Sequence, residues 1–223
     1  MKTSAVIFDA FGTLVEIQQP THPFRQLLRE GRRQGRLPRA DDIRAIMTRR
    51  LSLSEAALAF GIKISPSQLA FLDQCLEEEL ASIQPYPDAV EAVGLLQAAG
   101  VRLAVCSNLA MAYGPVVERI FPHLGAYGFS YRIGVMKPQA AIYQHTCDLL
   151  NVRPENELSG QRRIVMIGDS ERCDRDGPGH VGIKGYLLRR NGDGASNLSH
   201  FARSVLSDRW LRADLQFDGK RCV

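Results

Sequence analysis

Short apolar runs alternate with amphipathic stretches over most of the chain. The run at residues 3–8 (TSAVIF) carries no polar alternation and ends at Asp9, which predicts a strand of a parallel sheet buried on both faces. Further strands are predicted at residues 101–106, 127–131, 163–168 and 182–188. Helical periodicity is found between and after them, at residues 88–99, 112–120, 139–150 and 196–206. This order predicts an α/β fold, a doubly wound, Rossmann-like parallel sheet.

One purely helical segment interrupts the alternation. Residues 16–84 contain helical stretches and no strand pattern, with helices expected at 23–34, 41–60 and 66–82. We therefore expect an α/β core domain formed by residues 1–15 and 85–223, and an inserted helical domain at 16–84. Its two ends, near Val15 and Gln84, should lie close together as hinges.

The composition of the 223-residue chain is that of a folded globular protein, with 45% hydrophobic and 23% charged residues. The net charge of +4 is too small to predict nucleic-acid binding but is compatible with a small anionic substrate. No apolar run approaches the roughly 20 residues of a membrane-spanning helix, so we expect a cytoplasmic protein without membrane contact. Five widely spaced cysteines without a CxxC pair predict reduced thiols. The oligomeric state stays open.

Basic residues concentrate in the helical segment. Nine arginines fall between Arg25 and Arg50, and four recur at helical spacing: Arg25, Arg29, Arg32 and Arg36. A solvated outer helix face is the simpler interpretation. A contact with the anionic end of a substrate is the alternative.

Polar residues directly after the predicted strands carry the candidate chemistry, because ligands of open α/β sheets bind beyond the carboxyl ends of the strands. They form three clusters, with a lysine in a further loop: Asp9–Leu14, Ser107-Asn108, Gly168-Asp169-Ser170 with Asp174, and Lys137. Carboxylates bind a hard cation such as Mg²⁺, a lysine offsets their charge, and hydroxyl and backbone N–H groups hold an oxyanion. The combination predicts a site for Mg²⁺ and a charged group.

The order and spacing of these clusters resemble a known family. FDAFGTL from residue 8, SN at 107, KP at 137 and GDSxxxD with its aspartates at 169 and 174 reproduce the four-motif layout of the haloacid dehalogenase superfamily of hydrolases. The helical segment 16–84 resembles the α-helical cap of the first cap class in that family. Such a cap closes over the site, excludes water and selects the substrate.

The resemblance implies a role for each motif residue. Asp9 would be the nucleophile that forms a covalent intermediate, and Lys137 would offset charge on nucleophile and substrate. Substrate binding would fall to Thr13, Ser107 and Asn108. Mg²⁺ would be held by Asp9, the backbone carbonyl of Phe11, Asp169 and Asp174.

The first motif departs from the phosphatase pattern. Phosphatases of the family carry an aspartate two residues after the nucleophile as general acid and base, and this chain has Phe11 there. Phenylalanine transfers no proton, whereas a positioned acid–base group contributes about 10²–10⁴-fold. Dehalogenases of the family have an aromatic residue at this position, and halide leaves without a proton. Asn108 and Tyr143 also match dehalogenases, although Tyr143 could equally be a core residue.

The fourth motif points the other way. Dehalogenases have Ser and Asn in this loop, whereas this chain has Asp169 and Glu171. Several carboxylates without a cation would repel one another. We therefore predict Mg²⁺-dependent hydrolysis of a small phosphorylated metabolite. The alternatives are a metal-independent 2-haloacid dehalogenase and a non-catalytic relative that binds Mg²⁺ and phosphate in a regulatory role.

Overall fold

The computed structural model describes residues 3–154, 163–191 and 196–207. Its main feature is a five-stranded sheet in the order β5-β4-β1-β6-β7. The strands are β1 (Thr3–Phe8), β4 (Arg102–Ser107), β5 (Ala126–Phe129), β6 (Arg163–Gly168) and β7 (Lys184–Leu187). All neighbouring pairs are parallel, which confirms the predicted α/β fold.

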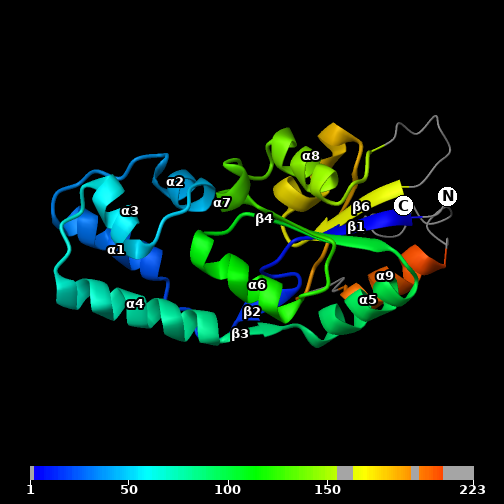
Figure 1. The fold of residues 1–223 in the computed structure, drawn as a ribbon, viewed down its shortest axis with the longest axis horizontal. Coiled ribbons are helices and arrows are strands. Elements are labelled where there is room, and N and C mark those ends of the chain that lie inside the picture. Colours follow the sequence, from blue (N-terminus) through cyan, green and yellow to red (C-terminus); the bar gives the residue numbers. More distant parts are fainter. Residues whose placement is uncertain (1–2, 155–162, 192–195, 208–223) are drawn as a thin grey trace, which may run out of the picture.

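Helices cover both faces of this sheet (Figure 1). One face carries α5 (Pro87–Ala98), α6 (Gly114–Ile120) and α9 (Leu198–Leu206), and the other carries α8 (Ala140–Leu149). The side chains of β1 alternate between the two hydrophobic clusters, because successive residues of a strand point to opposite faces. Val6 and Phe8 join the first cluster, and Ala5 and Ile7 join the second. This double burial explains why the strand is apolar throughout.

Short helical turns complete the core. They are η1 (Met111–Tyr113), α7 (Ser130–Ile133), the π-helix η3 (Glu171–Asp176) and η4 (Gly177–Val181). The predicted strand at 127–131 is shorter than expected, because Ser130 begins α7. The described cysteines Cys75, Cys106, Cys147 and Cys173 are free thiols, as predicted, while Cys222 lies outside the described residues.

The remaining helices form a separate group at one end of the molecule (Figure 1). They are α1 (Pro23–Arg33), α2 (Asp42–Thr48), α3 (Leu53–Phe60) and α4 (Pro66–Ala81). They share a hydrophobic cluster of their own, which includes Phe24, Leu27, Ile46 and Leu53.

One helix prediction in this group is wrong. The stretch 41–60 forms two helices, since Arg49 is extended and Ser52 starts α3 with a capping box to Glu55. Ser65 starts α4 with the same motif, as the Ser-Pro pair predicts.

Two short strands that the sequence pattern did not reveal connect this helical group to the core. β2 (Val15–Ile17) and β3 (Ile83–Pro85) pair antiparallel, with Glu16 opposite Gln84. The two chain connections therefore lie side by side. Three-residue strands are too short to show an alternating pattern in a sequence.

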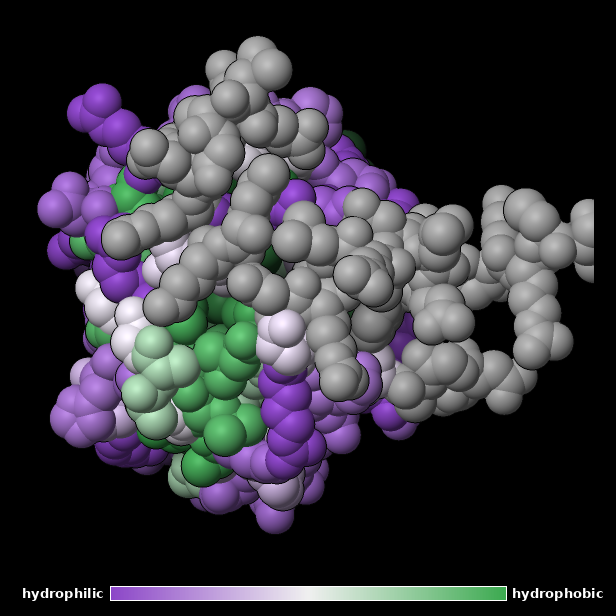
Figure 2. Space-filling view, turned by 90° about the vertical axis from the view of Figure 1, so that its right-hand side faces the viewer, coloured by the Kyte–Doolittle hydropathy of each residue, from purple (hydrophilic) through white to green (hydrophobic). Residues whose placement is uncertain are grey.

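A hydrophobic area bordered by hydrophilic residues is visible at the opposite end of the molecule (Figure 2). Within the described residues, no helix combines the length and hydrophobicity needed to cross a membrane.

Stability of the helical group should depend on its own core. Leu27 is fully buried, whereas Leu58 on the neighbouring helix α3 is 83% exposed. We expect Leu27→Ala to lower the free energy of unfolding by about 2–4 kcal/mol, because truncation leaves a cavity. Leu58→Ala should change it by less than about 0.5 kcal/mol. Urea unfolding followed by circular dichroism measures both, and equal effects would contradict the assigned packing.

Candidate active site

Three carboxylates converge at the carboxyl ends of β1 and β6, which are neighbours in the sheet. Asp9 directly follows β1, Asp169 directly follows β6, and Asp174 lies in η3. One oxygen of each lies within 4.8 Å of the others. Asp9 and Asp174 are buried and Asp169 is exposed. The structure thus brings together three acids that lie up to 165 residues apart in the sequence.

Lys137 connects two of these acids. Its Nζ donates to Oδ1 of Asp9 at 2.7 Å and to Oδ1 of Asp174 at 2.6 Å. The lysine is 4% exposed. Three carboxylates around one ammonium group leave an excess of negative charge in a poorly solvated place.

This excess of negative charge shifts the pKa values of Asp174 and Lys137. Burial and the nearby charge of Asp9 raise the pKa of Asp174 to about 6, even though Lys137 lowers it. Burial by itself lowers the pKa of Lys137, but Asp9 and Asp174 outweigh it and raise that pKa above its usual range. The all-oxygen donor set and the uncompensated charge fit a divalent cation such as Mg²⁺.

Two turns bring the backbone close to this cluster. Gly12 has a positive φ of 76°, and a Cβ there would lie 2.2 Å from Oδ2 of Asp169. Only glycine fits this approach without strain. Asp174 is fixed by the backbone N–H of Ser170, which donates to its Oδ2 at 2.9 Å.

Asn108 holds the lysine loop. Its Oδ1 accepts from the backbone N–H of Lys137 at 2.7 Å, and its Nδ2 donates to the Lys137 carbonyl at 3.0 Å. Both ends of the amide are therefore used to position Lys137. A contact with substrate stays a prediction.

The two predicted hydroxyl residues lie at the same edge of the sheet. Thr13 is fully buried in the turn after β1, and its Oγ1 has no hydrogen-bond partner within the described part of the chain. Ser107 is the buried last residue of β4. An unpaired buried hydroxyl is rare, and it fits a group that awaits an oxygen-rich ligand.

Two other residues that the sequence singled out are not members of the carboxylate cluster. Glu171 is an exposed side chain that pairs with Arg175, so it adds no charge to the cluster. Tyr143 is fully buried, and its hydroxyl donates to the Cys173 carbonyl at 2.6 Å. Through this hydrogen bond the tyrosine holds the backbone of η3, the element that carries Asp174.

Phe11 faces the helical group. Its ring meets that of Tyr113 edge to face, with centroids 5.7 Å apart. The Tyr113 hydroxyl donates to Oε1 of Glu79 in α4 at 2.5 Å. Phe11 also lines a cavity of about 400 Å³ between the core and the helical group, together with Asn108 and Phe24.

Arg190 is a site residue that the sequence analysis missed. Its Nε donates to the Gly12 carbonyl at 3.0 Å, and its Nη2 donates to the Thr13 carbonyl. Its Nη1 pairs with Asp88 at 3.0 Å, and the guanidinium lies 3.5 Å from the ring centroid of Tyr86. One side chain thereby fixes the turn after Asp9 and the start of α5. Arg190 lies just after the carboxyl end of β7. The rule that polar residues after strands form the site could therefore have found it too.

Comparison with known proteins agrees with this geometry. The sequence model of the haloacid dehalogenase-like hydrolases matches residues 3–181. The chain belongs to this family. That match confirms the resemblance seen in the motifs, and with it a hydrolase fold.

Relatives within the family differ in activity. The chain is 28% identical over 206 residues to (S)-2-haloacid dehalogenase 1 of Pseudomonas sp. (strain CBS-3), covering 83% of this chain and 84% of the relative. A phosphatase of the family from Thermococcus onnurineus has a similar structure, with a TM-score of 0.57, 23% identity, and 86% and 88% of the chains covered. A family enzyme from Bacteroides thetaiotaomicron, in complex with magnesium and inorganic phosphate, has a TM-score of 0.59 at 12% identity, with 86% and 96% covered.

Stability should reveal the constraint that Arg190 imposes. We expect Arg190→Gln to lower the free energy of unfolding by about 2 kcal/mol, because Asp88 and two carbonyls lose their donor. The adjacent Arg189 is exposed, and Arg189→Gln should have an effect below about 0.5 kcal/mol. Urea unfolding of the two variants measures the difference, and two equally stable variants would refute the assigned role.

Proposed function

We propose that this chain is a Mg²⁺-dependent hydrolase of a small phosphorylated metabolite, with Asp9 as the nucleophile. The observation that carries the proposal is the cluster of Asp9, Asp169 and Asp174 around the single ammonium group of Lys137. A site with this charge excess suits a divalent cation and, through it, a phosphate group.

Mg²⁺ would be held by the three aspartates and the backbone carbonyl of Phe11. The ion would neutralise charge on the phosphoryl oxygens. Asp169 is the exposed member of the cluster, so solvent reaches the site at Asp169.

The chain's own residues would perform the following steps. Lys137 donates to Oδ1 of Asp9 and leaves Oδ2 as the attacking atom. An Asp9 oxygen–phosphorus bond forms as the bond from phosphorus to the leaving oxygen breaks, and water then hydrolyses the aspartyl phosphate to return phosphate and free Asp9. Thr13 and Ser107 would hold phosphoryl oxygens through their hydroxyls.

We further propose that residues 16–84 act as the cap of a core formed by 1–15 and 85–223. The paired strands β2 and β3 support this division, since both chain connections run through them. The cavity of about 400 Å³ lies where the two parts meet. A cap there would shield the reaction from water.

Phe11 limits the leaving groups that this site can use. It provides no proton, and the hydroxyl of its neighbour Tyr113 already donates its hydrogen bond to Glu79. Burial and hydrogen bonding to Glu79 raise the pKa of Tyr113 above its usual range, so it is a poor proton donor at neutral pH. Substrates whose leaving oxygen needs little protonation, such as acyl or aryl phosphates, are therefore favoured.

Dehalogenation of a 2-haloacid is the second candidate, and Phe11 together with the 28% identical dehalogenase favours it. In that reaction Asp9 would displace halide from carbon, which requires no proton donor. The three carboxylates disfavour it, because a metal-independent site gains nothing from Asp169.

Phosphate release from a panel of acyl, aryl and alkyl phosphates tests the first candidate. We expect release that requires Mg²⁺, stops with EDTA, and falls about a thousandfold or more in Asp9→Asn, because the nucleophile is lost. Acyl and aryl phosphates should react fastest.

Halide release from 2-haloacids is measured on the same preparations. Halide release that persists in EDTA, without phosphate release, would refute the phosphatase proposal in favour of the dehalogenase. Mg²⁺-dependent binding of phosphate without either product would indicate a binding protein.

A gain-of-function variant tests the role of Phe11. We expect Phe11→Asp to raise the turnover of alkyl phosphates at least about tenfold, because it supplies the missing acid–base group. Phe11→Asn is the matched control, since asparagine has nearly the same size as aspartate and carries no transferable proton. Equal rates in the two variants would show that proton transfer at position 11 does not limit the reaction.

A further inference from the structure

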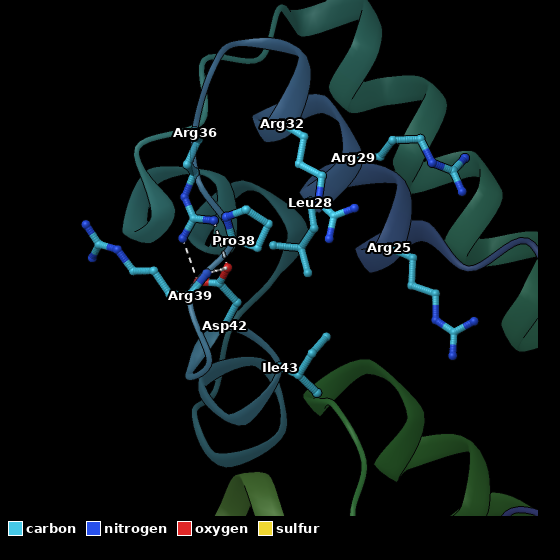
Figure 3. Close-up of a pocket in the computed structure, with 9 residues that line it drawn as sticks. All are labelled: Arg25, Leu28, Arg29, Arg32, Arg36, Pro38, Arg39, Asp42 and Ile43. Atoms are coloured by element: carbon cyan, nitrogen blue, oxygen red, sulfur yellow. Dashed lines mark hydrogen bonds and ion pairs between the residues drawn. The ribbon is translucent and has the colours of Figure 1, made fainter.

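A second cavity, of about 320 Å³, lies within the helical group between α1 and the segment leading into α2 (Figure 3). Its lining is dominated by arginines. The lining residues are Arg25, Leu28, Arg29, Arg32, Arg36, Pro38, Arg39, Asp42 and Ile43. We call this cavity the arginine groove.

Only one arginine of the groove is neutralised. Arg36 forms a two-pronged ion pair with the buried Asp42, at 2.7 and 2.6 Å. The other arginines that line the groove, namely Arg25, Arg29, Arg32 and Arg39, make no ion pair with any residue that the structure describes. Asp42 is the groove's single acid, so the groove carries a clear positive excess.

The helix places these cations on one side. Arg25, Arg29 and Arg32 follow one another at intervals of four and three residues on α1, which puts them on one helix face. Figure 3 shows the Arg32 guanidinium beside Leu28, while Arg29 and Arg39 extend at opposite margins. Guanidinium groups on one face match the geometry of phosphate and carboxylate oxygens.

The groove adjoins the cavity of about 400 Å³ that Phe11 lines. Arg25 and Ile43 line both. Between Phe11 at the active-site end and Arg25, the first cavity is lined mainly by apolar side chains, including Phe24 and Ile46. Glu79 also lines it, but both of its oxygens are taken, by Tyr113 on one side and by the backbone N–H groups of residues 21 and 22 on the other.

We propose that the arginine groove binds a second anionic group of the substrate. The inference rests on the proposed function and narrows its substrate class. The substrate would be an acyl or aryl phosphate whose reacting phosphate lies at Asp9 and whose middle is apolar. Its far end would carry a phosphate or carboxylate held by Arg25 and Arg32.

Matched pairs of synthetic ligands test this inference. Alkanediol bisphosphates of graded chain length are compared with alkyl monophosphates of equal length, in the presence of Mg²⁺. Equilibrium binding is measured by calorimetry on the wild type, whose metal site is intact and which turns alkyl phosphates over slowly because Phe11 supplies no proton, and hydrolysis is measured on the same protein. At one chain length we expect the bisphosphate to bind about tenfold more tightly than the monophosphate.

The double variant Arg25→Gln/Arg32→Gln should abolish this preference. Its KM for the bisphosphate should rise about tenfold while kcat stays unchanged, and its KM for the monophosphate should not move. Arg33→Gln is the control, because Arg33 lies on the same helix, pairs with Glu30 and does not line the groove. It should behave as the wild type does.

The possible results separate the two proposals. Equal binding of both ligands at every length, absence of binding, or a preference that survives the double variant would overturn the groove assignment. In each case, Mg²⁺-dependent phosphate release from the acyl and aryl phosphates by the wild type would still decide the proposed function. A preference that depends on the two arginines would support the groove as an anion site whatever the rate of hydrolysis, because alkyl phosphates are the poor leaving groups for this site.

Discussion

The buried ion pairs of Lys137 are the interaction on which the rest of the site depends. The ammonium group lies between Asp9 and Asp174, and all three side chains are buried. Each comes from a different segment, so the pairs tie the end of β1, the loop before α8 and η3 to one another. Loss of Lys137 would leave two buried carboxylates without a counter-charge, which typically costs several kcal/mol. Asn108 and Tyr143 act on this arrangement from outside, by fixing the lysine loop and the η3 backbone.

Position 11 determines what this charged centre can do. Phe11 replaces a proton-transferring residue with an apolar ring, and that ring packs on Tyr113, which in turn holds Glu79 of α4. The Phe11 ring contact and the Tyr113–Glu79 hydrogen bond together join the core to the helical group. Chemistry and the placement of the helices are coupled at this point, so a substitution here changes both proton transfer and packing.

The core site and the helical group carry charge excesses of opposite sign. The core site holds an excess of carboxylates, and the arginine groove on the helical group holds an excess of guanidinium groups. An apolar cavity that includes Phe11 and Ile43 separates them. Such a distribution suits a cation and phosphate at one end of a ligand and a second anion at the other.

The sequence by itself determined the parallel sheet and the motif residues. Apolar runs identify buried strands, and the strand-end rule found Asp9, Ser107 and Asp169 because local patterns carry that information. Its failures were also local, at the break after Thr48 and at the three-residue strands β2 and β3, where too few residues show a pattern. Only the tertiary structure decided how Lys137 is shared, what Arg190 holds and where the arginines gather, because these contacts join segments up to 178 residues apart.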